Sequence, residues 1–69
     1  MQLPMISSFK VSGLTQRRIH YIDAGADVSV RIRETAYIID HDVDGAREQF
    51  LFLYPGSIEV EVELIKHLG

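Results

Sequence analysis

Two runs of this chain are apolar at every position, and a polar stretch with Asp44-Gly45 at its centre separates them. The runs are residues 36–39 and 50–54. An Asp-Gly pair between two such runs is the strongest short-range signal for a β-hairpin with a two-residue turn. The sequence therefore predicts a hairpin over residues 35–54 that is apolar on both faces at its base, with a positive φ angle at Gly45.

This predicted hairpin supplies both candidate binding surfaces. The candidate interface at its base consists of Tyr37, Ile39, Phe50, Leu51, Phe52, Leu53 and Tyr54. The candidate partner-contact tip is charged and consists of Asp40, His41, Asp42, Asp44, Arg47 and Glu48. Because a strand pair with two apolar faces must be covered on both, we expect a homo-oligomer or another protein partner.

The chain length supports the same expectation. The 69 residues predict a single domain over residues 1–69, and a domain of this size buries only about 60% of the surface of its unfolded chain. Small folds gain support from disulfides, metals or oligomerisation, and the absence of cysteine excludes disulfides and thiolate metal sites. Oligomerisation is the remaining common support, and we expect no metal and no cofactor.

The aspartates of the polar stretch can be compared with a calcium-binding loop. Asp40, Asp42, Asp44 and Gly45 match the opening D-x-D-x-D-G of such a loop. The twelfth position, where a bidentate glutamate belongs, is Leu51. The sequence therefore favours an acidic hairpin tip over a calcium site.

Composition also bears on the class of partner and on location. The formal net charge of −3 speaks against a nucleic-acid binder. The first residues lack the basic segment and long apolar core of a signal peptide, and the longest apolar run, of five residues, is too short to span a membrane. We expect a cytoplasmic location, or a virion if the chain comes from a phage.

Three other segments alternate between apolar and polar residues, as half-buried strands do. They are residues 17–23, 28–33 and 58–64, and a four-residue loop at 24–27 would place Tyr21 opposite Val30. A bend or bulge is expected near residues 33–35, where alternation gives way to the continuous apolar run.

The fold that follows is all-β. We expect a small antiparallel meander of four or five strands, curled into a roll or an open barrel, from which the long hairpin emerges. Residues 1–15 carry the weakest pattern and are either a loose N-terminal arm or a short edge strand at 8–11. Pro55-Gly56 favours a type II turn, which would redirect the chain.

Two rows of opposite charge stand on the alternating segments. The basic row is Arg17, Arg18, Arg31 and Arg33, and the acidic row is Glu59, Glu61 and Glu63. The rows neutralise each other within the sheet if their strands are neighbours, or they meet between subunits. A basic patch left free would suit single-stranded nucleic acid.

No motif in the chain names a reaction: no activated nucleophile, metal cluster or phosphate-binding glycine loop is visible. We therefore expect a non-enzymatic assembly or interaction module that self-associates through residues 35–54. Small β-proteins of this kind occur among phage structural and accessory proteins, which is an analogy at the level of fold. Two alternatives stay open: a small barrel that binds single-stranded nucleic acid, and an inhibitor or accessory subunit that docks on a larger enzyme by strand addition.

Overall fold

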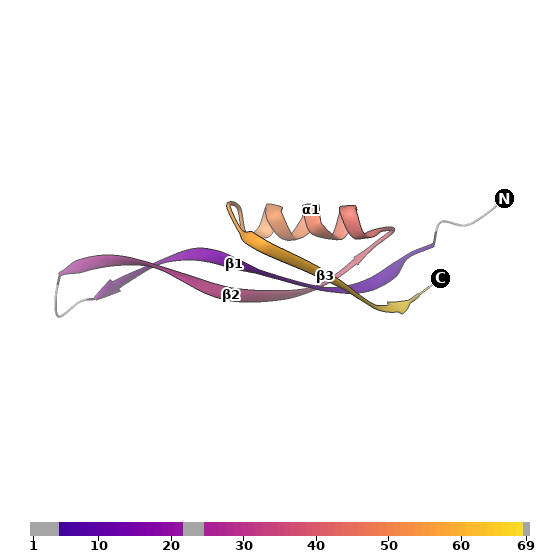
Figure 1. Cartoon of the computed structure of the whole chain (residues 1–69), viewed down its shortest axis with the longest axis horizontal. Coiled ribbons are helices and arrows are strands. Elements are labelled where there is room, and N and C mark those ends of the chain that lie inside the picture. Colours follow the sequence, from indigo (N-terminus) through magenta and orange to yellow (C-terminus); the bar gives the residue numbers. More distant parts are fainter. Residues whose placement is uncertain (1–4, 22–24, 69) are drawn as a thin grey trace.

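The chain forms a three-stranded antiparallel sheet with one helix packed on one of its faces (Figure 1). A computed structural model describes residues 5–21 and 25–68. Its elements follow the order β1 (Ser7–Tyr21), β2 (Ala26–Asp40), α1 (Val43–Leu53) and β3 (Ile58–His67). The strand order in the sheet is β2-β1-β3, so β1 is central. The expected all-β, antiparallel fold is confirmed in part: the chain is mostly strand, but it also contains α1. The described residues form three strands in an open sheet, instead of four or five strands in a roll or barrel.

The hairpin of β1 and β2 is much longer than the rest of the sheet. These strands pair over their whole length, from Ser7 with Asp40 to Tyr21 with Ala26. Strand β3 pairs with β1 only between Ser7 and Leu14. Beyond that point a two-stranded ribbon continues alone, and we call residues 15–21 and 26–32 the arm and the remainder the body (Figure 1).

The arm makes the molecule elongated. Its principal extents are 61 × 18 × 17 Å, and its radius of gyration is 15.9 Å. A compact chain of this length would have a radius of gyration of about 11 Å.

Where they are described, the alternating segments are strands as predicted, but their register differs. Tyr21 lies opposite Ala26 instead of Val30, and the expected loop at 24–27 falls partly on residues outside the described ones. No register shift separates β1 from β2, so the pairing has no β-bulge near residues 33–35, where a bend or bulge was expected. Two register shifts instead interrupt β3, and at one of them Glu59 adopts a φ angle of 53°.

From Ser7 on, the N-terminal segment is neither a loose arm nor an edge strand, and residues 1–4 lie outside the described ones. Residues 7–15 belong to the central strand, where Phe9 and Val11 face the helix and are buried. Gly13 follows them, and a larger residue there would have to displace Phe50, because its Cβ atom would lie only 2.9 Å from Cε1 of that ring. The segment with the weakest alternation is thus a strand, and its small residue Gly13 lets the helix approach closely.

The hairpin predicted over residues 35–54 is wrong, because its second half is helix α1. Asp42 caps the helix by accepting a hydrogen bond from the Gly45 backbone N–H at 2.7 Å. Ala46 and Phe50, one turn apart, are both buried against the sheet. Gly45 has no positive φ angle; a side chain at this position would collide with the Asp40 carboxylate.

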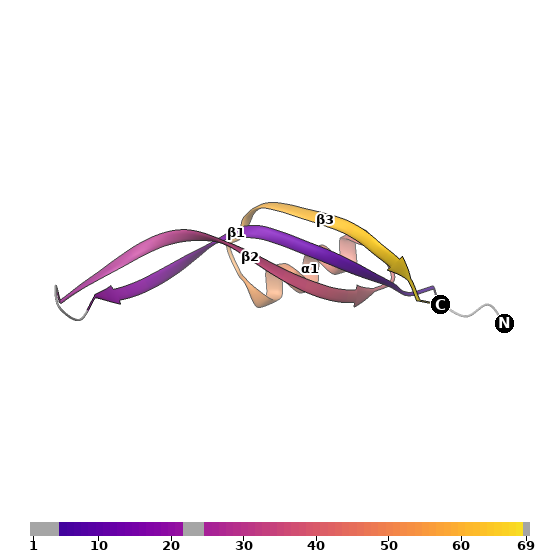
Figure 2. The same cartoon turned by 90° about the horizontal axis from the view of Figure 1, so that it is seen from below.

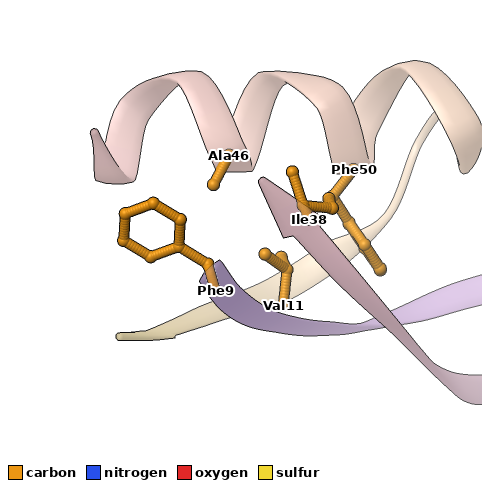
Figure 3. Close-up of a cluster of buried hydrophobic side chains, with 5 residues drawn as sticks. All are labelled: Phe9, Val11, Ile38, Ala46 and Phe50. Atoms are coloured by element: carbon orange, nitrogen blue, oxygen red, sulfur yellow. The ribbon is translucent and has the colours of Figure 1, made fainter. Parts of the chain in front are cut away.

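The hydrophobic core lies between α1 and the sheet of the body (Figure 3). Its buried members are Phe9, Val11, Ile38, Ala46 and Phe50, and the partly buried residues packed on them are Ala36, Tyr54, Val60 and Val62. The rings of Phe50 and Tyr54 lie 5.0 Å apart. The helix ends there, and the expected turn at Pro55-Gly56 is confirmed by a φ angle of 79° at Gly56 and a bond from the Ser57 N–H to the Tyr54 carbonyl.

Candidate interaction surface

One face of the sheet is covered by α1, and the other is bare within the described residues (Figures 1 and 2). Residues alternate between faces along a strand, so the burial of Val11 and Ile38 places their neighbours on the bare side. We call this bare side the open face. It runs without interruption from the body into the arm, because β1 and β2 keep one register throughout.

The open face of the body carries exposed apolar side chains. Tyr37 is 71% exposed, Ile39 is 59% exposed and Ile58, which pairs with Leu14, is 44% exposed. An antiparallel sheet tolerates a solvated face when that face is polar. This face instead carries three large apolar side chains that are exposed to solvent.

Charged residues stand on either side of this apolar group. On the arm, Arg18 and Arg31 occupy the open face, and on the body Glu61 and Glu63 do so. Within residues 5–21 and 25–68, none of these four side chains forms an ion pair within 4.0 Å. A hollow on the open face is lined by Lys10, Ser12, Glu61, Val62 and Glu63.

The two charge rows are not neighbours within the sheet, because β1 lies between the strands that carry Arg31 and Glu61. Only Arg33 reaches across, and its guanidinium lies 3.9 Å from the Glu59 carboxylate. Arg17 points to the helix side and binds Glu34 at 2.7 Å. The hypothesis that the rows neutralise each other within one sheet is therefore wrong for most of their members.

The residues of the predicted interface are divided among three environments. Tyr37 and Ile39 lie on the open face, as just described, whereas Phe50 is fully buried. Phe52 and Leu53 are 86% and 59% exposed on the outer surface of α1. Leu51 and Tyr54 are half-buried. A helix turns by about 100° per residue, so the single aromatic face expected of a strand does not exist.

The residues of the predicted tip gather where β2 leads into α1. Asp42 caps the helix, and the Asp40 carboxylate accepts hydrogen bonds from the Gln49 side chain and from the His41 backbone N–H. These bonds, that from Gln49 first, hold the pKa of Asp40 below its ordinary value. His41 Nδ1 lies 3.0 Å from the Met5 carbonyl oxygen.

The other members of the predicted tip, Asp44, Arg47 and Glu48, are exposed on the helix. In the described part of the chain, no group of three histidine, aspartate or glutamate side chains is placed to hold a metal ion. Two aspartates of the tip, Asp40 and Asp42, instead accept hydrogen bonds at and near the start of the helix.

Sequence reasoning missed that the arm stands free of the body. On its helix side the arm carries Ile19, Val28, Val30 and Ile32, of which Val28 is 41% exposed and the others are half-buried. On its open face it carries Arg18 and Arg31, together with His20 and Asp27, whose side chains lie 2.7 Å apart. The signal that could have revealed it was the long stretch without glycine or proline after Val28.

Comparison with known proteins found no family model, no curated protein and no solved structure that matches this chain. Among the described residues, no helix has the length and apolar character needed to cross a membrane.

Proposed function

We propose that the chain is a non-enzymatic assembly module that associates with a second copy of itself. The observation that carries this proposal is the surface area. The chain exposes 5296 Å², whereas a compact monomer of 7.8 kDa exposes about 4400 Å². The difference of about 900 Å² is close to the roughly 800 Å² that each partner contributes to a standard protein interface.

The distribution of large apolar residues supports the same proposal. Five hydrophobic side chains form the buried core. The exposed large hydrophobic residues are Met5, Val28, Tyr37, Ile39, Val43, Phe52, Leu53, Ile58, Leu64, Ile65 and Leu68. A soluble monomer usually exposes single apolar residues, but not a set twice as large as its core. Association would bury part of this set.

The arm gives a further reason for association. A two-stranded ribbon without a third strand or a covering helix is at best marginally stable in water. The arm has neither among the described residues, yet its strands stay paired to Tyr21 and Ala26. Contact with a second copy would supply the missing layer.

The experiment that tests this proposal is the solution mass of the chain. Light scattering at micromolar concentrations is expected to give twice the 7.8 kDa of one chain, with dissociation on dilution. A mass of 7.8 kDa throughout that range would contradict self-association.

A second candidate rests on the free outer edge of β2. Within the described residues, Ala26–Asp40 pairs on one side only, which leaves a row of backbone donors and acceptors unpaired on the other. A strand of a larger enzyme could add there, as proposed for an accessory subunit. Hydrogen exchange of the isolated chain distinguishes the two: an accessory subunit would protect the outer amide groups of β2 only after its enzyme is added, whereas self-association would slow exchange as the chain concentration rises.

A further inference from the structure

We propose that two copies join edge to edge in their arms, with residues 26–32 of β2 paired antiparallel with the same residues of the second copy. This inference rests on the proposed self-association and names the edge that performs it. The two segments are related by a two-fold axis that is perpendicular to the sheet and passes between the two Ser29 residues. We call this contact between the two segments the seam.

The outer edge of β2 is accessible along the arm. Figures 1 and 2 show the arm extending clear of α1 and β3, and among the described residues β2 pairs with β1 alone. Alternate residues of such an edge direct their backbone N–H and C=O groups outward, ready to pair with another strand. Residues 26–32 contain no proline and no lysine, which often block such pairing. Pairing of two copies over this length would form about six to eight backbone hydrogen bonds.

The charges of the segment are complementary to themselves. With the axis at Ser29, Asp27 of one copy lies directly opposite Arg31 of the other, and symmetry repeats this pair. Opposite residues of an antiparallel pair point to the same face, so both pairs form on the open face. Within the described residues, Arg31 forms no ion pair in its own chain, and the Asp27 side chain, beside His20, is 53% exposed. Each seam charge is thus available to the second copy.

The apolar residues of the segment are complementary in the same register. Val28 of one copy lies opposite Val30 of the other, and Ala26 lies opposite Ile32, all on the helix side. Val28 is 41% exposed, and cross-strand pairs of β-branched residues stabilise a sheet. The seam also turns two ribbons of two strands into one sheet of four, and a sheet with an apolar face needs at least three strands for independent stability.

Other pairings of the free edges oppose like charges. The outer edge of β1 in the arm, residues 15–21, carries two arginines and no acidic residue. Pairing β2 with itself over its full length, Ala26–Asp40, would set the axis at Arg33, which would face its own counterpart. That register would also place Ile32 opposite Glu34. Like charges directly opposite each other destabilise a strand pair, so these registers are disfavoured.

The nearest alternative register moves the axis by one residue, to Val30. It would place Arg31 opposite Ser29 and pair Asp27 with Arg33, which already lies 3.9 Å from an acidic side chain of its own chain. The axis at Ser29 instead gives the unpaired Arg31 an acidic partner. Charge therefore selects the register at Ser29.

The first experiment reverses the charges of the seam and measures dimer dissociation by sedimentation equilibrium. Arg31→Asp and Asp27→Arg each place like charges opposite each other twice in a dimer, so each should raise the dissociation constant about tenfold or more. Both side chains are exposed, so the variants should keep the far-ultraviolet circular dichroism spectrum of the wild type. A variant with both changes restores opposite charges and keeps the net charge of −3. It should dimerise within about twofold of the wild type and weaken as salt rises.

Arg18→Asp is the matched control for Arg31→Asp. Arg18 is exposed on the same face of the arm, and its replacement changes the net charge equally. It stands on β1, however, one strand away from the seam. Arg18→Asp should leave the dissociation constant within about twofold of the wild type.

A disulfide on the axis tests the register. The chain contains no cysteine, and the Cα atoms of the two Ser29 residues should lie about 4.5–5.5 Å apart, within the range that a disulfide spans. Ser29→Cys should therefore give a covalent dimer quickly on mild oxidation. Thr35→Cys is the control, because Thr35 is equally exposed on the same strand and face but lies outside the seam. It should cross-link much more slowly.

Three results would overturn the inference. A wild-type dimer that Arg31→Asp and Asp27→Arg leave equally tight would place the interface elsewhere, while self-association stays intact. Cross-linking of the control as fast as that of Ser29→Cys would refute the register. A single-stranded oligonucleotide that binds the wild type at physiological salt, but neither Arg31→Asp nor Arg18→Asp, would assign the arm to nucleic acid. A monomeric wild type would instead refute the proposed function itself.

Discussion

Phe50 and Phe52 provide a matched pair for testing the helix. They are the same residue type, two positions apart in α1, yet Phe50 is fully buried and Phe52 is 86% exposed. In a β-strand these two side chains would share one face and have similar surroundings. Replacing each by alanine therefore measures whether the segment is a helix packed on the sheet.

The expected magnitudes differ widely. Phe50→Ala removes a ring that lies 5.0 Å from the Tyr54 ring and packs against Gly13, and such a change costs about 3–5 kcal/mol. A chain of 69 residues has a total stability of about 3–10 kcal/mol, so this variant is expected to be largely unfolded at low denaturant. Phe52→Ala leaves no cavity and gains helix propensity, so its stability should stay within about 0.5 kcal/mol.

The assay is urea unfolding followed by circular dichroism, with Phe50→Leu as a graded variant that should cost about 1 kcal/mol. Each variant is measured at two protein concentrations so that dissociation is separated from unfolding. Equal losses for Phe50→Ala and Phe52→Ala would refute the helix and restore the strand that the sequence predicted.

Three further predictions concern single residues of the body. Gly13→Ala should destabilise the fold by about 1–3 kcal/mol in the same unfolding assay, because its Cβ would press on Phe50; a neutral effect would contradict the close packing. Asp42→Ala should lower the free energy of unfolding by about 1 kcal/mol, because it removes the helix cap. An unchanged melting temperature would contradict the capping hydrogen bond. The pKa of Asp40 is lower in the folded state than in the unfolded state, where it is about 4. Ionised Asp40 therefore stabilises the fold above about pH 4, and this stabilisation is lost as the pH falls through the folded pKa. Stability measured between about pH 5 and pH 2 should therefore decline less steeply for Asp40→Ala than for the wild type, and parallel curves would show that Asp40 is not linked to folding.

The strands of this fold were largely predictable from alternation. The pattern at residues 17–23, 28–33 and 58–64 predicted strands where β1, β2 and β3 lie. In β3 the alternation follows the core, because Val60 and Val62 pack on it while their neighbours meet solvent. In the arm, no helix of the described residues covers either face. The pairing register of the strands was not predictable, since it depends on which turn closes the ribbon and on the shifts in β3.

The helix could not be identified from the apolar run alone. Continuous apolar residues fit a buried strand and a short buried helix equally well, and Asp-Gly is a turn signal as well as part of a helix start. The discriminating features were Asp42 in a capping position and the helix formers between Ala46 and Gln49. Burial of Ala46 and Phe50 against the sheet, with Phe50 over Gly13, is a tertiary contact that decides the outcome, and no local pattern reports it.

The candidate interaction surface was also predictable only in part, because it depends on which distant segments pair in the sheet. Tyr37 and Ile39 were predicted as interface residues, and the structure places both, exposed, on the open face. The charge rows were also visible in the sequence. That β1 separates the strands of Arg31 and Glu61 follows only from the strand pairings.

The mass of the chain in solution, followed by sedimentation equilibrium over a dilution series, tests self-association most directly. One chain has a mass of 7.8 kDa. Self-association predicts a mass near twice this value at micromolar concentrations and a fall toward the mass of one chain on dilution. A mass of 7.8 kDa at every concentration would contradict self-association.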